Sequence, residues 1–149
     1  MIGWRHTIRV WVYACYKRQL RSLAIAGSIL TGVDNKVTLA DKLAQFSEHW
    51  SPQTVAQFND NDIMVVKVRG AFVWHTHDHT DDFFMVLKGR LTVRLRDRAV
   101  TLEPGDVLVV PRGVDHQPFA EEEVELLLIE PTGTPNTGKR ETAAPRRVM

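Results

Sequence analysis

The second half of the chain alternates hydrophobic and polar residues with a period of two, which is the pattern of half-buried β-strands. The clearest run covers residues 91–96, where Leu91, Val93 and Leu95 share one face and polar side chains the other. Further short strands are predicted at residues 55–58, 63–68, 71–77, 83–87, 100–102, 106–110 and 124–129. Turn residues separate these runs, so the spacing indicates an all-β sandwich or barrel.

One helical segment precedes the strands. Leu39, Leu43 and Phe46 follow Thr38 at helical spacing, with charged residues between them. Pro52 ends this segment, because the residue before a proline is driven away from the α region. The chain has 149 residues and no internal repeat, so we expect one domain with a short N-terminal helix.

Charge divides the chain into three parts. Residues 1–33 contain five Lys or Arg and no acid, and residues 139–149 contain four Lys or Arg and one Glu. Residues 34–138 contain 10 basic and 17 acidic side chains. We therefore predict a domain over 34–138, flanked by a basic N-terminal extension and a mobile basic tail. An acidic body argues against nucleic acid as the partner.

The basic extension leaves several interpretations open. Its apolar run, residues 23–30, is too short to span a bilayer as a helix. A transit peptide, an amphipathic surface anchor and a translated upstream region with a natural start near Val33 remain alternatives. The single cysteine, Cys15, allows no disulfide within one chain. We expect a cytoplasmic protein without a membrane span.

Histidines and carboxylates are densest in residues 74–82, which contain three of each. His75 and His77 are two residues apart, so in a β-strand both imidazoles point to the same face. Asp82 opens the next strand and could reach the same ion. Two histidines and a carboxylate, with open positions left over, suit Fe(II), Mn(II), Ni(II) or Zn(II). A polar surface loop is the alternative interpretation of such a cluster.

A second segment, residues 105–116, is a predicted strand between two turns and ends in a fourth histidine. Together with the first segment it resembles the two sequence motifs of the cupins. The matching residues are Gly70, His75, His77, Asp82 and Gly89 in the first motif, and Gly105, Pro111, Gly113 and His116 in the second. The chain departs from the motifs at Asp82, where Glu is usual, and at Ala120, where Asn is usual.

The resemblance implies a single cupin-type jelly-roll β-barrel of the small, one-barrel kind. It also implies one divalent transition metal, Fe, Mn, Ni or Zn, held by His75, His77, Asp82 and His116. Such barrels often pair, so we expect a homodimer. The outer face of residues 83–87 would need either a partner or the N-terminal helix as its cover.

The expected cavity beside the metal is apolar and aromatic. If Asp82 faces inward, alternation sends Phe84 and Val86 inward too. Val73 shares a strand face with the two histidines, and Phe119 follows closely after His116. The predicted wall is therefore Val73, Phe84, Val86 and Phe119. It suits a small organic molecule, or dioxygen at Fe(II), better than a sugar phosphate, which needs Arg or Lys inside.

Two residues near the rim, His79 and Asp81, are the candidates for an acid–base role, with exposed loop residues as the alternative. The sequence therefore predicts a metal-dependent enzyme of oxygenase or isomerase type that acts on a small organic molecule. The alternative is a cupin that binds a small ligand without catalysis.

Overall fold

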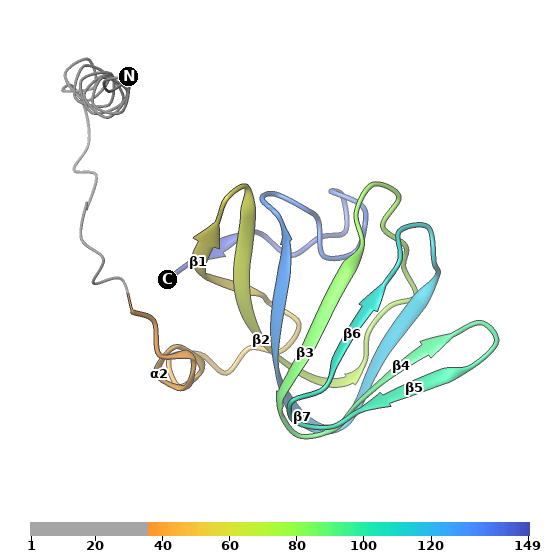
Figure 1. The fold of residues 1–149 in the computed structure, drawn as a ribbon, viewed down its shortest axis with the longest axis horizontal. Coiled ribbons are helices and arrows are strands. Elements are labelled where there is room, and N and C mark those ends of the chain that lie inside the picture. The colour runs from red at the N-terminus through yellow and green to blue at the C-terminus, as the bar shows by residue number, and fades with distance from the viewer. Residues whose placement is uncertain (1–35) are drawn as a thin grey trace, which may run out of the picture. The chain divides into compact units, whose positions relative to one another are not determined.

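The computed structural model describes residues 36–149, which form one short helix and eight strands (Figure 1). The elements are α2 (Leu39–Leu43), β1 (Gln53–Phe58), β2 (Asn61–Ala71), β3 (Asp82–Lys88), β4 (Leu91–Leu95), β5 (Ala99–Leu102), β6 (Val107–Val110), β7 (His116–Pro131) and β8 (Arg147–Val148). The extension predicted over residues 1–33 lies outside the described residues. Among the described elements, no helix is long and apolar enough to cross a membrane.

The long strand β7 organises the sheet. Its first residues pair with β4, and its second half lies between β2 and β3, always antiparallel (Figure 1). β6 continues the sheet beyond β3, whereas β1 and then β8 continue it beyond β2. The inward side chains of β2, β3 and β7 therefore meet in one core, as expected of the predicted all-β fold.

Alternation along β3 decides which side chains enter that core. Asp82, Phe84 and Val86 are buried, whereas Phe83 and Met85 between them are only half-buried. This agrees with the inward face predicted from the sequence. Burial removes apolar surface from water and so supplies the main stabilisation. The core contains Met64, Val66, Val68, Phe84, Val86, Leu91, Val93, Leu102, Val110, Ala120, Val124, Leu126 and Leu128.

The helix covers part of the outer face, as the sequence analysis allowed. Leu43 of α2 is buried in a second cluster with Val55 and Val65, and Leu87 of β3 packs against this cluster. The cover does not extend to β6, where Val107 and Val109 are exposed. The outer face of the sheet is therefore closed on the α2 side and open along β6.

The predicted strand over residues 71–77 is wrong in its second half. β2 ends at Ala71, which pairs with Phe119, and the next paired residue is His75, which bridges to His116. The chain advances four residues from Ala71 to His75, but only three from His116 to Phe119 on the segment opposite. The segment after β2 therefore contains one extra residue, a β-bulge. Such a bulge reverses the facing of the side chains that follow it.

The C-terminal segment also differs from the mobile tail expected beyond residue 138. β8 pairs in parallel with β1, and Met149 packs against the second cluster. The guanidinium of Arg146 donates to both carboxylate oxygens of the buried Asp62, over 2.6 and 2.8 Å. A bidentate pair of this kind is both strong and directional. We call residues 131–149 the C-terminal strap.

The ion pair between Arg146 and Asp62 should make the stability of the protein depend on pH. Hydrogen bonds from Arg146 lower the pKa of Asp62 from 3.8 to about 2. Because this pKa is depressed in the folded state, its stabilisation is complete above pH 3.8 and is lost as pH falls through 2. Asp62→Asn should reduce the unfolding free energy at pH 7 by about 1–2 kcal/mol. The loss is no larger because Arg146 is partly exposed, and water screens its charge.

Chemical denaturation of wild type and Asp62→Asn at pH 7 and at acidic pH tests this expectation. The difference between them should shrink toward pH 2. Asp60→Asn, in the neighbouring exposed turn, is the matched control and should change little. An equal loss of unfolding free energy in both variants would show that the ion pair between Arg146 and Asp62 does not stabilise the fold.

Candidate metal centre

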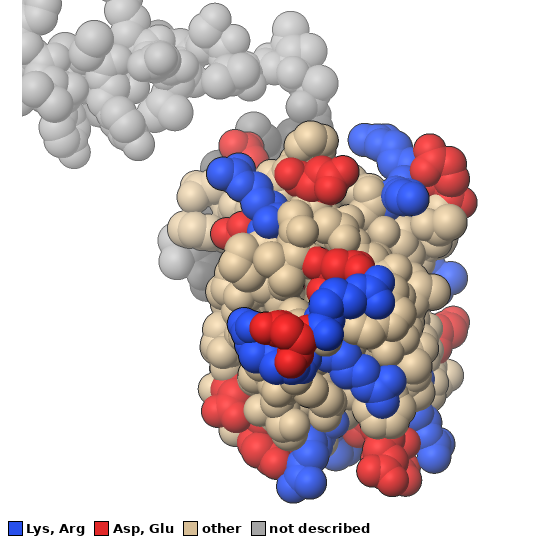
Figure 2. Space-filling view, turned by 90° about the vertical axis from the view of Figure 1, so that its right-hand side faces the viewer, with Lys and Arg blue, Asp and Glu red and all other residues tan. Residues whose placement is uncertain are grey.

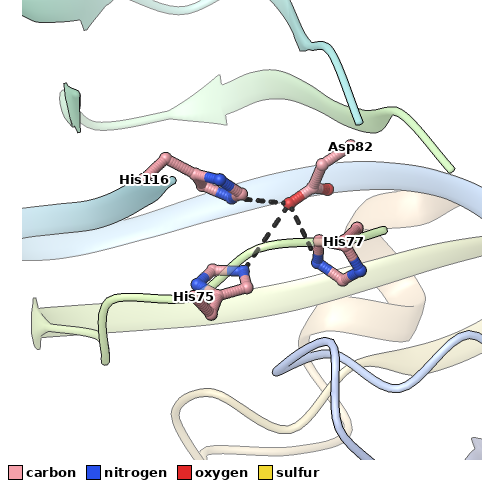
Figure 3. Close-up of side chains that lie close together, drawn as sticks. All are labelled: His75, His77, Asp82 and His116. Carbon is pink, nitrogen blue, oxygen red and sulfur yellow. Dashed lines mark hydrogen bonds and ion pairs between the residues drawn. The ribbon is translucent and has the colours of Figure 1, made fainter. Parts of the chain in front are cut away.

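Four buried side chains converge at one end of the core (Figure 3). His75 and His77 come from the irregular segment after β2, Asp82 is the first residue of β3, and His116 is the first residue of β7. One ligand atom from each lies within 4.8 Å of the others. The structure thus brings together all four residues that the sequence predicts as ligands.

The main chain fixes the two histidine-bearing segments to each other. The N–H of His75 donates to the carbonyl of His116, and the N–H of His116 donates back, both over 3.0 Å. Nearby, the N–H of Gly113 donates to the carbonyl of His77 over 2.9 Å. These bonds place imidazoles from distant parts of the chain side by side.

Hydrogen bonds also set the direction in which two imidazoles point. The Nδ1 atoms of His75 and His116 lie 3.1 and 3.0 Å from the carbonyl oxygens of Val73 and Val114. A carbonyl only accepts, so each Nδ1 carries a proton, and Nε2 is the nitrogen that faces Asp82 and that would bind an ion once deprotonated. Carbonyl partners of this kind orient metal-binding histidines in proteins.

The three Nε2 atoms face a single oxygen of Asp82. Its Oδ2 lies 3.0 Å from His116, 3.5 Å from His77 and 3.8 Å from His75, as the dashed lines in Figure 3 show. The Nε2 of His77 is buried and has no hydrogen-bond partner among the described residues. Leaving such an atom unsatisfied is costly. A divalent cation would satisfy the three nitrogens and the oxygen together, so this donor set fits a transition metal.

The charges of the cluster depend on one another. Burial would raise the pKa of Asp82, but the hydrogen bond from His116 and the nearby imidazoles of His75 and His77 hold it well below 3.8. Burial alone would lower the pKa of His116, yet the hydrogen bond with Asp82 raises it above 6.5. Burial lowers the pKa of His77. The Asp82 carboxylate and the His116 imidazole therefore each favour the charged form of the other.

An apolar cavity of about 40 Å³ reaches His75 and Asp82 from inside the core. Trp50 and Phe72 stack on each other in its wall with ring centroids 4.7 Å apart, and Phe84 faces it as predicted. Val86 is buried on the same face, but it packs in the core and does not line the cavity. The wall nearest the candidate metal is therefore largely aromatic and aliphatic.

Two of the predicted wall residues lie outside the cavity. Val73 is 55% exposed, because the extra residue between Ala71 and His75 turns it outward and brings Phe72 in. Phe119 points to the opposite face of β7 from His116, since it is an odd number of residues away, and the guanidinium of Arg94 covers its ring at 4.2 Å. Strand parity could have placed Phe119 from the sequence, whereas no local pattern marks the extra residue that turns Val73 outward.

The candidates for an acid–base role are both exposed. Asp81 accepts a hydrogen bond from the backbone N–H of Arg112 over 3.0 Å, which ties two loops together. Neither His79 nor Asp81 lines the described cavities. Their exposed positions match the alternative interpretation as loop residues.

Sequence analysis missed Glu130, the second carboxyl group that lines the cavity beside Asp82. Its side chain is buried, and burial together with the charge of Asp82 raises its pKa to about 9. Alternation from Val124 through Leu126 and Leu128 places Glu130 inward, so the sequence did contain the signal. Trp50 was missed as well, because it precedes β1 in an irregular turn.

The outer surface has mixed charge where Figure 2 shows it, with Lys and Arg next to Asp and Glu. On β4, β5 and their connections these side chains form ion pairs: Arg90 with Glu103, Arg96 with Asp115, and Arg98 with Asp97. Arginines paired in this way are not arranged to bind a phosphate. The chemistry that distinguishes the described residues therefore lies inside the fold.

Comparison with known proteins agrees with this arrangement. A family model described as Cupin domain matches residues 62–130. A crystal structure of a cupin-2 domain protein from Shewanella frigidimarina is 43% identical, with a TM-score of 0.64, over 65% of this chain and 95% of that one. A protein from Neisseria meningitidis is 31% identical, with a TM-score of 0.60, over 65% of this chain and 99% of that one.

A more distant structure shares the fold alone. Hydroquinone 1,2-dioxygenase from Sphingomonas is 19% identical, with a TM-score of 0.60, over 72% of this chain and 35% of that chain. The family match and the two nearer structures suffice for assignment. The chain belongs to the cupin superfamily, as a small protein with a Cupin_2 domain.

Proposed function

We propose that this cupin is a metalloenzyme of oxygenase or isomerase type, acting on a small organic molecule at one divalent ion of Fe, Mn, Ni or Zn. The observation that carries the proposal is the convergence of three Nε2 atoms on one Asp82 oxygen, where the buried Nε2 of His77 has no hydrogen-bond partner within residues 36–149. Buried polar atoms in folded proteins usually have a hydrogen-bond partner, so this nitrogen, beside three other possible ligand atoms, favours a bound ion.

Two groups of residues form the site: one would hold the ion, and the other lines the cavity beside it. His75, His77, His116 and Asp82 would hold the metal. When bound, such an ion acts as a Lewis acid that polarises a substrate oxygen. Trp50, Phe72 and Phe84 exclude water from the adjoining cavity and would contact the apolar part of a substrate. The Sphingomonas protein with this fold is a dioxygenase by name, which favours including oxygenase chemistry.

A second candidate function is binding of a small ligand without catalysis. One observation favours it: the predicted acid–base candidates, His79 and Asp81, are exposed and do not line the cavity. The two functions share the metal and the cavity. They differ only in whether a bound molecule is converted, so turnover of a bound compound by the metal-loaded protein separates them.

The first expectation concerns the three histidines. His75→Ala, His77→Ala and His116→Ala should each lower metal affinity by more than about 100-fold, because each removes a direct ligand. His79→Ala is the matched control and should keep its metal, since its side chain is exposed. Elemental analysis of protein purified without a histidine tag and without added metal checks this. Metal retained by all three ligand variants would contradict the site.

The second expectation separates the adjacent carboxylates. Asp82→Ala should weaken metal binding far more than Asp81→Ala, because Asp82 faces the histidines and Asp81 faces a loop amide. Competition with a fluorescent chelator measures both affinities under the same conditions. If the two variants weakened binding equally, Asp82 would not be the acidic ligand.

The third expectation concerns pH. Metal binds to neutral imidazole, and the pKa of His116 lies above 6.5 in the metal-free protein. Protons therefore compete with the ion as pH falls through that raised pKa, and affinity should decrease from mildly alkaline to acidic pH. Calorimetric titrations with Zn²⁺ across this range test the sign. Affinity that stayed constant, or rose as pH fell, would exclude His116 as a ligand.

A further inference from the structure

We propose that Glu130 binds the ligand of the cavity, and that this ligand is about the size of one six-membered ring and carries a hydroxyl or amine group. The inference rests on the proposed function, because it places that molecule beside the candidate metal. It adds a recognition residue and a substrate class to the site.

Two adjoining cavities give the size. The inner one, of about 40 Å³, reaches His75 and Asp82, and the outer one, of about 130 Å³, lies under the C-terminal strap. Both are lined by Pro52, Leu128, Glu130 and Asn136. For comparison, an apolar protein cavity of about 150 Å³ accepts one benzene ring. The space therefore suits a single ring or an aliphatic molecule of similar bulk.

Glu130 is the polar group most in need of a partner in this space. It is 4% exposed and lies where the two cavities join. The groups that act on it are the carboxyl of Asp82, which also hydrogen-bonds to it, and the carboxyl of Asp62, and no described basic side chain forms an ion pair with it. A buried carboxyl group without a basic partner is rare and costly. A carboxyl group has two oxygens, so a hydroxyl or amine on a bound molecule would supply a further hydrogen bond from inside the cavity.

Other polar groups around the outer cavity already have partners. Asp62 is held by Arg146, and the side-chain carbonyl of Asn136 accepts the N–H of Ala144 over 2.9 Å. The rings of Trp50 and Phe72 occupy the inner wall. An apolar body between these rings and Leu128, with one polar group directed at Glu130, therefore matches the site better than a molecule that is polar all round.

The test compares two compounds that differ in one hydrogen-bond donor. Benzyl alcohol and benzyl methyl ether share a ring, but the ether cannot donate. Isothermal titration calorimetry with the zinc-loaded full chain should show the alcohol binding at least about 10-fold more tightly, since an unmet buried polar group is penalised. Benzylamine, which can also donate, should bind at least as well as the alcohol.

Variants assign the preference to Glu130. Glu130→Leu should remove the alcohol-over-ether preference, whereas Glu130→Gln should keep part of it, because an amide still hydrogen-bonds. Glu125→Gln is the matched control, since Glu125 lies on the opposite face of β7 and pairs with Lys88. The ratio of the two affinities is the readout, so a general loss of stability does not mimic the effect.

Metal content measured in the same samples separates this inference from the proposed function. A zinc-loaded protein that binds alcohol and ether equally, or that binds none of the three compounds at millimolar concentration, overturns the role of Glu130 and leaves the metal site standing. A preference that Glu130→Leu retains also overturns it. A protein that shows the preference but holds no zinc supports Glu130 and refutes the metalloenzyme.

Discussion

The two backbone hydrogen bonds between His75 and His116 are the interaction on which the site depends. The segment after β2 has left the regular ladder, so these bonds, with that from the N–H of Phe72 to the carbonyl of Pro118, hold it against β7. The bond from Gly113 to His77 ties it to the loop before β7. The two bonds between His75 and His116 fix the main chain at both histidines at once. Each imidazole then needs only its Nδ1 contact with a carbonyl two residues earlier to point its Nε2 atom inward.

Strand β7 joins the metal centre to the cavity. It begins at His116, beneath the ligand cluster, and reaches Glu130 near its other end. Its inward side chains between these points are apolar and belong to the core. Both ends of the strand lie beside Asp82, because His116 hydrogen-bonds to Asp82 and Glu130 lines the same cavity as Asp82. The C-terminal strap lines the outer cavity at the Glu130 end, where Arg146 pairs with Asp62.

The sequence predicted the β fold, the inward face of β3 and the four side chains of the cluster, because alternation and motif spacing are local signals. It placed Val73 and Phe119 wrongly, since facing depends on a one-residue bulge that no local pattern reveals in the first case and on strand parity in the second. The roles of Trp50 and the C-terminal strap depend on contacts between distant parts of the chain. Leu126, Leu128 and Glu130 are every second residue of one strand, so the inward direction of Glu130 could be predicted. The predicted strand, however, ended one residue before it.

The contact between His116 and Asp82 has a consequence for how the protein acquires its metal. Asp82 is held 3.0 Å from His116, so the protein's own contacts gather the ligands at one place. A preformed site of nitrogen and oxygen donors binds divalent ions in the general order of their intrinsic affinities, with copper and zinc ahead of iron and manganese. The geometry therefore provides little discrimination by itself. Which ion the protein carries in its cell would then be decided by the supply of free metals during folding.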